Sequence, residues 1–201
     1  MEIDVQSWVS QEGTKYIKTL GIMPGQVVVD FGCNAGYYAI PAAKVVGAEG
    51  TVYAIDKDDL AIKQLLKTMQ AQHLDNIKPI LSDKPVIDLP AASADAILLY
   101  DILHYFDRYD RELLYRSVNT VLKPDGILSV FPKHNQANIP MWHLAELSIT
   151  DIMSEIERNN FILMQKEQRC LIHDDRIEKA IILNFKNSKI KANNKSKIDK
   201  K

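Results

Sequence analysis

The sequence predicts an α/β protein with a doubly wound, mostly parallel sheet and helices on both faces. Strand and helix patterns alternate along the chain, as expected for such a sheet. Three valines, residues 27–29, run into a turn that contains Gly32 and Gly36, which is typical of a buried strand followed by a sharp backbone turn. A second apolar strand ends at Asp56, 20 residues after Gly36. This is the spacing of a ribose-binding acid in a nucleotide-binding βαβ unit.

The individual elements follow from apolar periodicity and from start and stop signals. An opening helix ends before Gly21 and Pro24, Asp58 is the expected N-cap of a later helix, and Pro41 predicts a kink in the helix after the first strand. The expected helices are 4–20, 35–46, 58–72, 108–122 and 149–159. The expected strands are 27–31, 51–55, 77–81, 95–100, 126–131, 161–169 and 177–185, with a turn at Asp174–Asp175 between the last two.

Composition predicts one globular domain, residues 1–185, and a disordered lysine-rich tail, residues 186–201. The chain has 201 residues, of which 46% are hydrophobic, enough for a sizeable core. The tail holds seven lysines and one aspartate, a charge of +6, so the remainder of a chain with net charge -1 carries -7. A polar basic segment without aromatic residues is typical of a solubilising tail, and an acidic body disfavours a nucleic-acid partner.

Location and metal content are also constrained. No apolar run reaches the length of a membrane span, and the acidic N-terminus lacks a signal-peptide pattern, so we expect a cytoplasmic protein with no membrane partner. Two cysteines, Cys33 and Cys170, are too few for a disulfide framework or a zinc cluster.

The turn after the first strand favours an adenosine-containing cofactor that has no phosphates. A dinucleotide fingerprint needs a third glycine, and this position is Tyr37, whose side chain would crowd a pyrophosphate. Asp30, just before the turn, would repel phosphates and attract a cation. S-adenosylmethionine, which combines a sulfonium, an amino group, a ribose and an adenine, fits these requirements.

The segment from Asp30 to Gly36 resembles motif I of the class I S-adenosylmethionine-dependent methyltransferases, Asp-x-Gly-x-Gly-x-Gly. Asn34 replaces the middle glycine, and asparagine tolerates left-handed backbone angles better than most residues. Ser82–Asp83 resembles the family's adenine-contacting position, and residues 122–126 resemble its Leu-Lys-Pro-Gly-Gly turn. The resemblance covers residues 20–185. It implies seven strands in the order 3-2-1-4-5-7-6, with the last two strands antiparallel, and S-adenosylmethionine as cofactor. The cofactor-binding residues it implies, with their neighbours, are Asp30, Phe31, Gly32, Cys33, Asn34, Gly36, Asp56, Lys57, Ser82, Asp83 and Tyr100.

The methyl acceptor is expected at the carboxyl ends of the strands. The long connection 133–147 is the expected acceptor lid. His104, His134 and His143 are candidates for a general base, which an acceptor hydroxyl would need. The residues expected to contact the acceptor are Tyr37, Tyr38, Tyr105, Lys133, Met141 and Trp142.

Several subclasses lack their signature residues. The sequence Tyr100-Asp101-Ile102-Leu103 has neither the Pro-Pro-aromatic motif of amino-methylating nucleic-acid enzymes nor the cysteine of cytosine C5 enzymes. Arsenite methylation needs more cysteines. A catechol-type magnesium site needs acids after the fourth and fifth strands; Asp101 could be one, but residues 133–135 supply none, so we expect no metal. The prediction is therefore a partly apolar or aromatic small-molecule acceptor.

Three alternatives stay open. The first is a nicotinamide dehydrogenase on the same sheet, which Asp30 and Tyr37 disfavour. The second is an S-adenosylmethionine-binding protein without catalytic activity, and the third is a homologue that modifies nucleic acid or protein.

Overall fold

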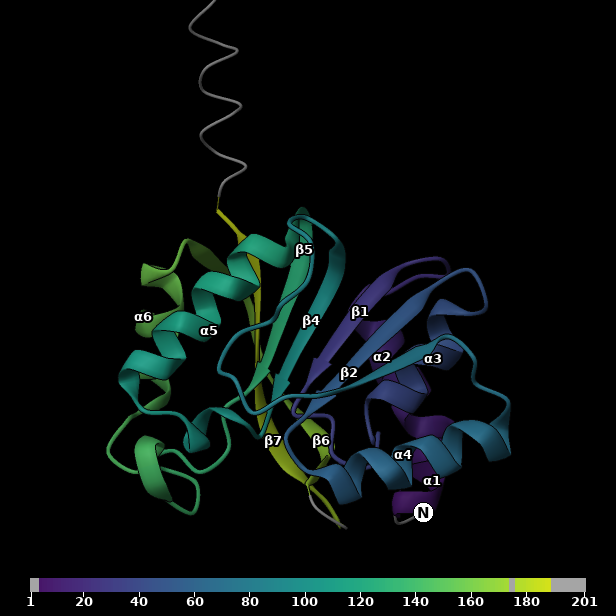
Figure 1. Cartoon of the computed structure of the whole chain (residues 1–201). Coiled ribbons are helices and arrows are strands. Elements are labelled where there is room, and N and C mark those ends of the chain that lie inside the picture. Colours follow the sequence, from purple (N-terminus) through teal and green to yellow (C-terminus); the bar gives the residue numbers. More distant parts are fainter. Residues whose placement is uncertain (1–3, 174–175, 189–201) are drawn as a thin grey trace, which may run out of the picture.

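A computed structural model describes residues 4–173 and 176–188 of the chain. Its centre is a seven-stranded sheet in the order β3-β2-β1-β4-β5-β7-β6 (Figure 1). The first five strands pair in parallel, and β7 pairs antiparallel with both β5 and β6. The predicted fold class and strand order are therefore confirmed. The strands are β1 (Val27–Phe31), β2 (Thr51–Asp56), β3 (Ile77–Leu81), β4 (Ala94–Tyr100), β5 (Leu122–Phe131), β6 (Phe161–His173) and β7 (Arg176–Asn187).

Helices cover both faces of the sheet because successive strand residues point to opposite sides. Val28 packs in one apolar cluster with the N-terminal helices, and Val29 packs in a second cluster with the later helices. Both valines are fully buried, as expected for central parallel strands. The first cluster lies under α2 (Gly13–Thr19), α3 (Ala39–Val46) and α4 (Asp59–Gln72), and the second lies under α5 (Arg108–Val121) and α6 (Ile149–Arg158).

The opening helix is not uniform. It consists of α1 (Val5–Ser7), a π-helical turn η1 (Trp8–Glu12) and α2, where the sequence predicts one continuous helix. The wider turn places Trp8 in the core, where its indole N–H donates a 2.9 Å hydrogen bond to the carbonyl oxygen of Tyr37. Single π turns of this kind are frequent at functional sites.

The helix after β1 begins at Ala39, not at residue 35 as predicted. Asn34 (φ 47°) and Gly36 (φ 93°) have left-handed backbone angles, which a right-handed helix does not accept. Pro41 consequently lies in the first turn of α3, where its missing N–H has no intrahelical partner to lose. The predicted kink therefore has no cause at this position.

Three strands are longer than predicted by more than one residue. β5 begins at Leu122, and its pairing with β4 shifts register between Ala94 and Ala96, so the predicted turn at 122–126 lies inside the strand. β6 continues four residues further, to His173, and β7 reaches Asn187, two residues into the segment assigned to the tail. The turn at 174–175 and residues 189–201 of the tail lie outside the described residues. Among the described helices, none is long and apolar enough to cross a membrane.

Candidate functional site

A cavity of about 530 Å³ lies at the carboxyl ends of β1, β2 and β4. The chain order of the strands reverses between β1 and β4, and the crevice at such a switch point is the usual ligand site of an open α/β sheet. From the predicted cofactor and acceptor residues, the cavity wall includes Phe31, Gly32, Cys33, Asn34, Tyr37, Tyr38, Asp56, Lys57, Ser82, Asp83, Tyr100 and Tyr105.

The turn after β1 gives a ligand access to the backbone. Gly32 has a φ of +85°, and a Cβ atom at this residue would lie 2.8 Å from Cδ1 of Ile102. Any larger residue would therefore meet both backbone strain and the opposite wall of the cavity. Gly36 has a different role, because a Cβ there would lie 2.5 Å from Leu65 of α4. Gly36 is buried and does not line the cavity, so it permits close packing of the helix.

Asp56 is positioned by the turn itself. Its Oδ2 atom accepts a 2.7 Å hydrogen bond from the backbone N–H of Asn34, and its Oδ1 atom accepts a 2.9 Å bond from that of Asp58. A carboxylate oxygen has two lone pairs, so each oxygen retains capacity for one more donor. The carboxylate is thus fixed at the cavity wall and can accept from two hydroxyl groups.

Asp30 lies beneath this turn and not on the cavity wall. It is 1% exposed, and Oδ2 has no hydrogen-bond partner among the described residues. Burial, together with the nearby charge of Asp56, raises the pKa of its carboxyl to about 7, although the backbone amide of Ala39 donates to it. A cationic ligand in the cavity would favour the ionised form. Burial also raises the pKa of the Cys33 thiol, so this cysteine has no reactive thiolate.

Aromatic rings gather at Tyr105, which lines the cavity. Tyr105, in the 3₁₀ turn η2 (Leu103–Tyr105), lies with its ring centroid 4.8 Å from that of Trp142, in the turn η3 (Trp142–Leu144). The ring of His104 stacks on Trp142 at 5.2 Å. The Lys57 ammonium lies 4.3 Å from the centroid of Tyr105. Trp142 is 57% exposed, so an apolar group entering from solvent can contact it.

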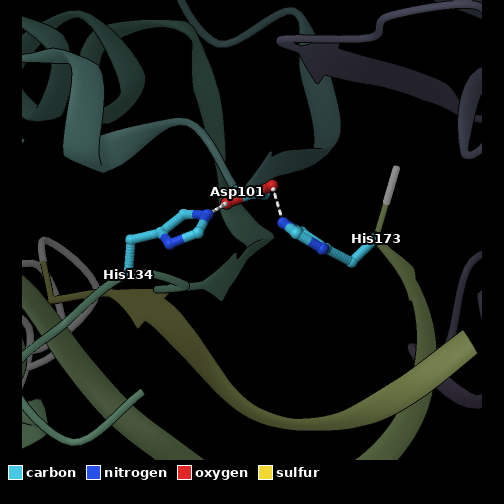
Figure 2. Close-up of side chains that lie close together, drawn as sticks. All are labelled: Asp101, His134 and His173. Carbon is cyan, nitrogen blue, oxygen red and sulfur yellow. Dashed lines mark ion pairs between the residues drawn. The ribbon is translucent and has the colours of Figure 1, made fainter. Parts of the chain in front are cut away.

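Beside these rings, three side chains from distant segments converge, as Figure 2 shows. Asp101 follows β4, His134 follows β5, and His173 ends β6. Nε2 of His173 lies 2.8 Å from Oδ2 of Asp101, and Nε2 of His134 lies 3.7 Å from Oδ1. Asp101 lines the cavity, so this cluster lies at its edge.

The three histidines predicted as bases have different environments. His104 is buried, and burial lowers its pKa to about 3, with further lowering by His134 and His173, so its ring is a weak base at neutral pH. His143 is exposed on η3, and His134 belongs to the cluster around Asp101. Other predicted residues also lie outside the cavity wall: Lys133 is buried in an ion pair with Glu178, and Met141 and Trp142 lie on the 133–147 connection, where the ring of Trp142 contacts that of Tyr105.

Comparison with known proteins identifies the family of the segment that carries most of this site. Residues 28–126 match the family described as "Methyltransferase domain", a segment that contains the Gly32 turn and Asp56 but neither His134 nor His173. This match supports membership of the chain in the class I S-adenosylmethionine-dependent methyltransferase family. The family prediction from motif I is confirmed.

Individual relatives of this methyltransferase-family chain differ in what they modify. It is 34% identical over 74 residues to aklanonic acid methyltransferase from Streptomyces sp. (strain C5), which covers 37% of this chain and 34% of that protein. It is 35% identical over 75 residues to a tRNA(Phe) (4-demethylwyosine(37)-C(7)) aminocarboxypropyltransferase from Methanocaldococcus jannaschii, with 37% and 30% covered. The chain thus spans about a third of the length of these relatives.

The fold similarity extends over most of the chain. A solved structure of an S-adenosylmethionine-dependent methyltransferase from Aquifex aeolicus superposes with a TM-score of 0.71 at 20% identity, covering 87% of this chain and 88% of that one. At this identity the similarity supports the fold only.

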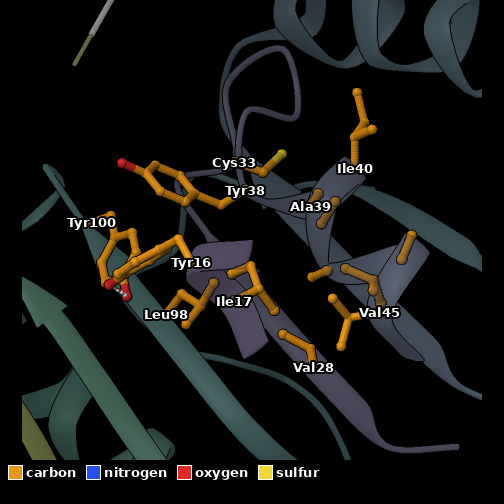
Figure 3. Packing of buried hydrophobic residues seen from close by; sticks show 14 of the residues in the cluster. Tyr16, Ile17, Val28, Cys33, Tyr38, Ala39, Ile40, Val45, Leu98 and Tyr100 are labelled. Atoms are coloured by element: carbon orange, nitrogen blue, oxygen red, sulfur yellow. Dashed lines mark hydrogen bonds between the residues drawn. The ribbon is translucent and has the colours of Figure 1, made fainter. Parts of the chain in front are cut away.

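Beneath the site, tyrosines connect the opening helix to the sheet (Figure 3). The hydroxyl of Tyr100 lies 2.6 Å from those of both Tyr16 and Ser129, and Ser129 donates to Asn184 in β7. Tyr38 donates a 2.8 Å bond to the carbonyl oxygen of Ile172. Tyr38 and Tyr100 were predicted to contact acceptor and cofactor, but these bonds already engage their hydroxyls, so they offer ring surface to a ligand.

Two residues of the cluster, Asp101 and His173, were not among the predicted site residues. Asp101 was considered only as half of a magnesium site and was set aside because no acid follows β5. His173 was missed because the predicted strand ended at residue 169. The buried pair Leu171–Ile172, after several exposed residues, is the signal in the sequence that β6 returns to the core.

Proposed function

We propose that the protein transfers a methyl group from S-adenosylmethionine to a small-molecule acceptor. One observation carries this proposal. A single cavity is lined both by the Gly32 turn with the fixed carboxylate of Asp56 and by Tyr105 and Asp101. A donor and an acceptor bound in this cavity would therefore lie close to one another.

The residues around Asp56 suit each part of S-adenosylmethionine. Asp56 has capacity to accept from two hydroxyls, as a ribose requires. Ser82 and Asp83, after β3, line the cavity on the same side and supply polar groups for the adenine. The open turn at Gly32–Asn34 leaves room for the methionine part, and the buried carboxyl of Asp30 favours a nearby sulfonium over a phosphate.

The residues around Tyr105 suit a flat or partly apolar molecule. Tyr105 and Trp142 offer ring faces, and an exposed tryptophan beside a cavity is a typical contact for a small ligand. Methyl transfer from a sulfonium is a displacement at carbon with a good leaving group, so the protein mainly aligns the two reactants and excludes water. The body of the chain carries a charge of -7, which opposes the phosphate contacts that dominate nucleic-acid affinity.

The test is incubation of the full chain with methyl-tritiated S-adenosylmethionine and a cell extract divided into small molecules, RNA and protein. We expect label in the small-molecule fraction, and much less with the Trp142→Ala variant at low acceptor concentration. Label confined to RNA would overturn the small-molecule proposal and favour the tRNA-type activity of one relative. An absence of transfer, with the cofactor bound, would favour a non-catalytic binding protein.

A further inference from the structure

We propose that Asp101, His134 and His173 bind one divalent first-row transition-metal ion at the edge of the cavity. Each residue contributes one donor atom, and these atoms all lie within 4.8 Å of one another. Two imidazoles and one carboxylate are a donor set that suits zinc, ferrous iron or a similar ion, whereas magnesium prefers oxygen ligands. This inference does not depend on the proposed function, because metal binding can be measured without an acceptor.

The hydrogen bonding of His134 fixes the tautomer that a metal ligand needs. Its Nδ1 atom lies 2.9 Å from the carbonyl oxygen of Ile139, and a carbonyl only accepts, so Nδ1 carries the proton. In the neutral ring, Nε2 is then a bare lone pair. Metal-binding histidines usually donate their other ring N–H to a carbonyl or carboxylate in this way.

The bare Nε2 of His134 faces another acceptor. Oδ1 of Asp101 lies 3.7 Å away, too far for a good hydrogen bond. Nδ1 of His104 lies 3.4 Å from the same oxygen. A lone pair that faces a carboxylate is unfavourable unless a proton on Nε2 or a metal ion lies between them. A metal ion bound by both atoms would take the place of that proton.

Backbone strain also holds the cluster in place. Asp101 (φ 54°) and His134 (φ 63°) both have left-handed backbone angles, which cost free energy in residues other than glycine. Asp101 directly follows β4, His134 lies three residues after the end of β5, and the two side chains turn toward one another (Figure 2). Strain of this kind persists where the surrounding structure requires one side-chain position, and it is concentrated at functional sites.

Zinc binding requires only small movements of the three side chains. Ligand atoms about 2.0–2.2 Å from a tetrahedral zinc ion lie about 3.3–3.6 Å apart. Oδ2 of Asp101 and Nε2 of His173, which are 2.8 Å apart, would separate by about 0.5 Å, whereas rotation of the His134 ring would shorten its longer distance to Asp101. Asp101 and Ile172 line the cavity, so an ion at the cluster would face it. An acceptor hydroxyl bound there would lose its proton more easily.

The experiment uses the full chain after treatment with a chelator. We expect calorimetry to show one zinc ion bound per chain, and cobalt(II) to give visible absorption bands on binding. His173→Gln and Asp101→Asn should each weaken zinc binding by about 100-fold or more, beyond the loss usual for an outer partner of a ligand. Magnesium at the same concentration should not compete.

The matched control is His73→Asn. His73 is an exposed histidine after α4, whose first turn lies at the cavity and whose 14 residues span about 20 Å. Asparagine suits its left-handed backbone, so this variant should bind zinc like the wild type.

X-ray absorption of the zinc-loaded wild type supplies a readout that does not depend on variant folding. Imidazole and oxygen ligands without sulfur are expected, since a sulfur ligand would indicate the exposed Cys170. The proposal is overturned by zinc affinity weaker than about 0.1 mM, by sulfur ligation, or by unchanged affinity in both cluster variants. Calorimetry with S-adenosylmethionine alone separates this outcome from failure of the proposed function.

Discussion

The backbone N–H of Asn34 donates a 2.7 Å hydrogen bond to Oδ2 of Asp56. This bond joins the turn after β1 to the end of β2, so the carboxylate proposed to hold the ribose also holds the loop around the methionine part. The residue that departs from the motif I pattern thus contacts Asp56 through its backbone, a bond that glycine would retain, while its side-chain Oδ1 accepts a 2.7 Å hydrogen bond from the backbone N–H of Ala35.

Removal of this carboxylate should weaken cofactor binding. We expect Asp56→Ala to weaken the binding free energy of S-adenosylmethionine by about 1–3 kcal/mol, because hydrogen bonds to a charged acceptor are lost. Calorimetry measures the change. Asp59→Ala, which removes a neighbouring exposed acid outside the cavity, should bind as the wild type does. Equal affinity in the two variants would contradict the assignment of Asp56.

Gly32 and Gly47 allow backbone strain to be separated from loss of space. Both have positive φ, but a Cβ at Gly47 would meet nothing within 4 Å, whereas one at Gly32 would lie 2.8 Å from Ile102. Gly47→Ala should cost about 1–2 kcal/mol of unfolding free energy and leave cofactor affinity unchanged. Gly32→Ala should cost more unfolding free energy than Gly47→Ala and should strongly weaken cofactor binding. Urea unfolding and calorimetry on both variants measure this difference; a Gly32→Ala protein with wild-type affinity would argue against the site.

Asp30 should make the protein less stable as the pH rises. Its pKa is raised from 3.8 to about 7 in the folded state. Between these values the folded state holds a proton that the unfolded state has lost. The stabilisation is therefore full below about pH 4 and lost as the pH rises through about 7. Asp30→Asn should have a higher melting temperature than the wild type at about pH 8, and the difference should shrink toward about pH 4. If the difference in melting temperature between the two proteins is the same at both pH values, the pKa of Asp30 is not raised in the folded state.

The same carboxyl predicts a proton release on cofactor binding. A sulfonium near Asp30 favours its ionised form, whereas the neutral sulfur of the demethylated product does not. Calorimetry near neutral pH, in buffers of different ionisation enthalpy, should show more proton release with S-adenosylmethionine than with S-adenosylhomocysteine. The Asp30→Asn variant should release the same number of protons with both ligands. If the wild type also releases the same number with both, the sulfonium does not change the ionisation of Asp30.

A buried ion pair links α5 and α6. Arg111 is 3% exposed, and its guanidinium donates to both carboxylate oxygens of Glu155 at 2.7 and 2.8 Å. Glu155→Ala leaves an unpaired buried charge and should cost about 3–5 kcal/mol of unfolding free energy. The double change Arg111→Met with Glu155→Leu should recover much of this loss. Glu157→Ala, on the exposed side of α6, is the control in urea unfolding, and a similar small loss for both glutamates would refute the prediction.

The central strands could be predicted because their residues are buried on both faces. A run such as Val27–Val29 has few alternatives to a parallel strand, and the spacing of Asp56 from the turn is local. The start of α3 was predicted four residues too early because Ala35–Tyr38 favours a helix by composition. Left-handed angles at Asn34 and Gly36 override that preference.

The cluster around Asp101 could not be predicted from spacing. Its members come from three loops or strand ends, and their approach depends on the length of β6. Most residues from Gln165 to Cys170 are exposed. Polar and apolar residues do not alternate there in a way that would indicate a core face, so the sequence does not show that the strand continues. The roles of the candidate site residues stay predictions until cofactor and acceptor binding are measured.

The position of β7 in the sheet has a consequence for folding. β6 precedes β7 in the chain, yet it reaches the sheet only through β7, which lies between β5 and β6. During synthesis β6 emerges first and has no neighbour among the described strands until β7 has inserted. The turn at Gly32 and the carboxylate of Asp56 belong to strands that can therefore pair while the chain is still being translated. His173 can reach Asp101 only after the last strand, β7, has been translated and has paired.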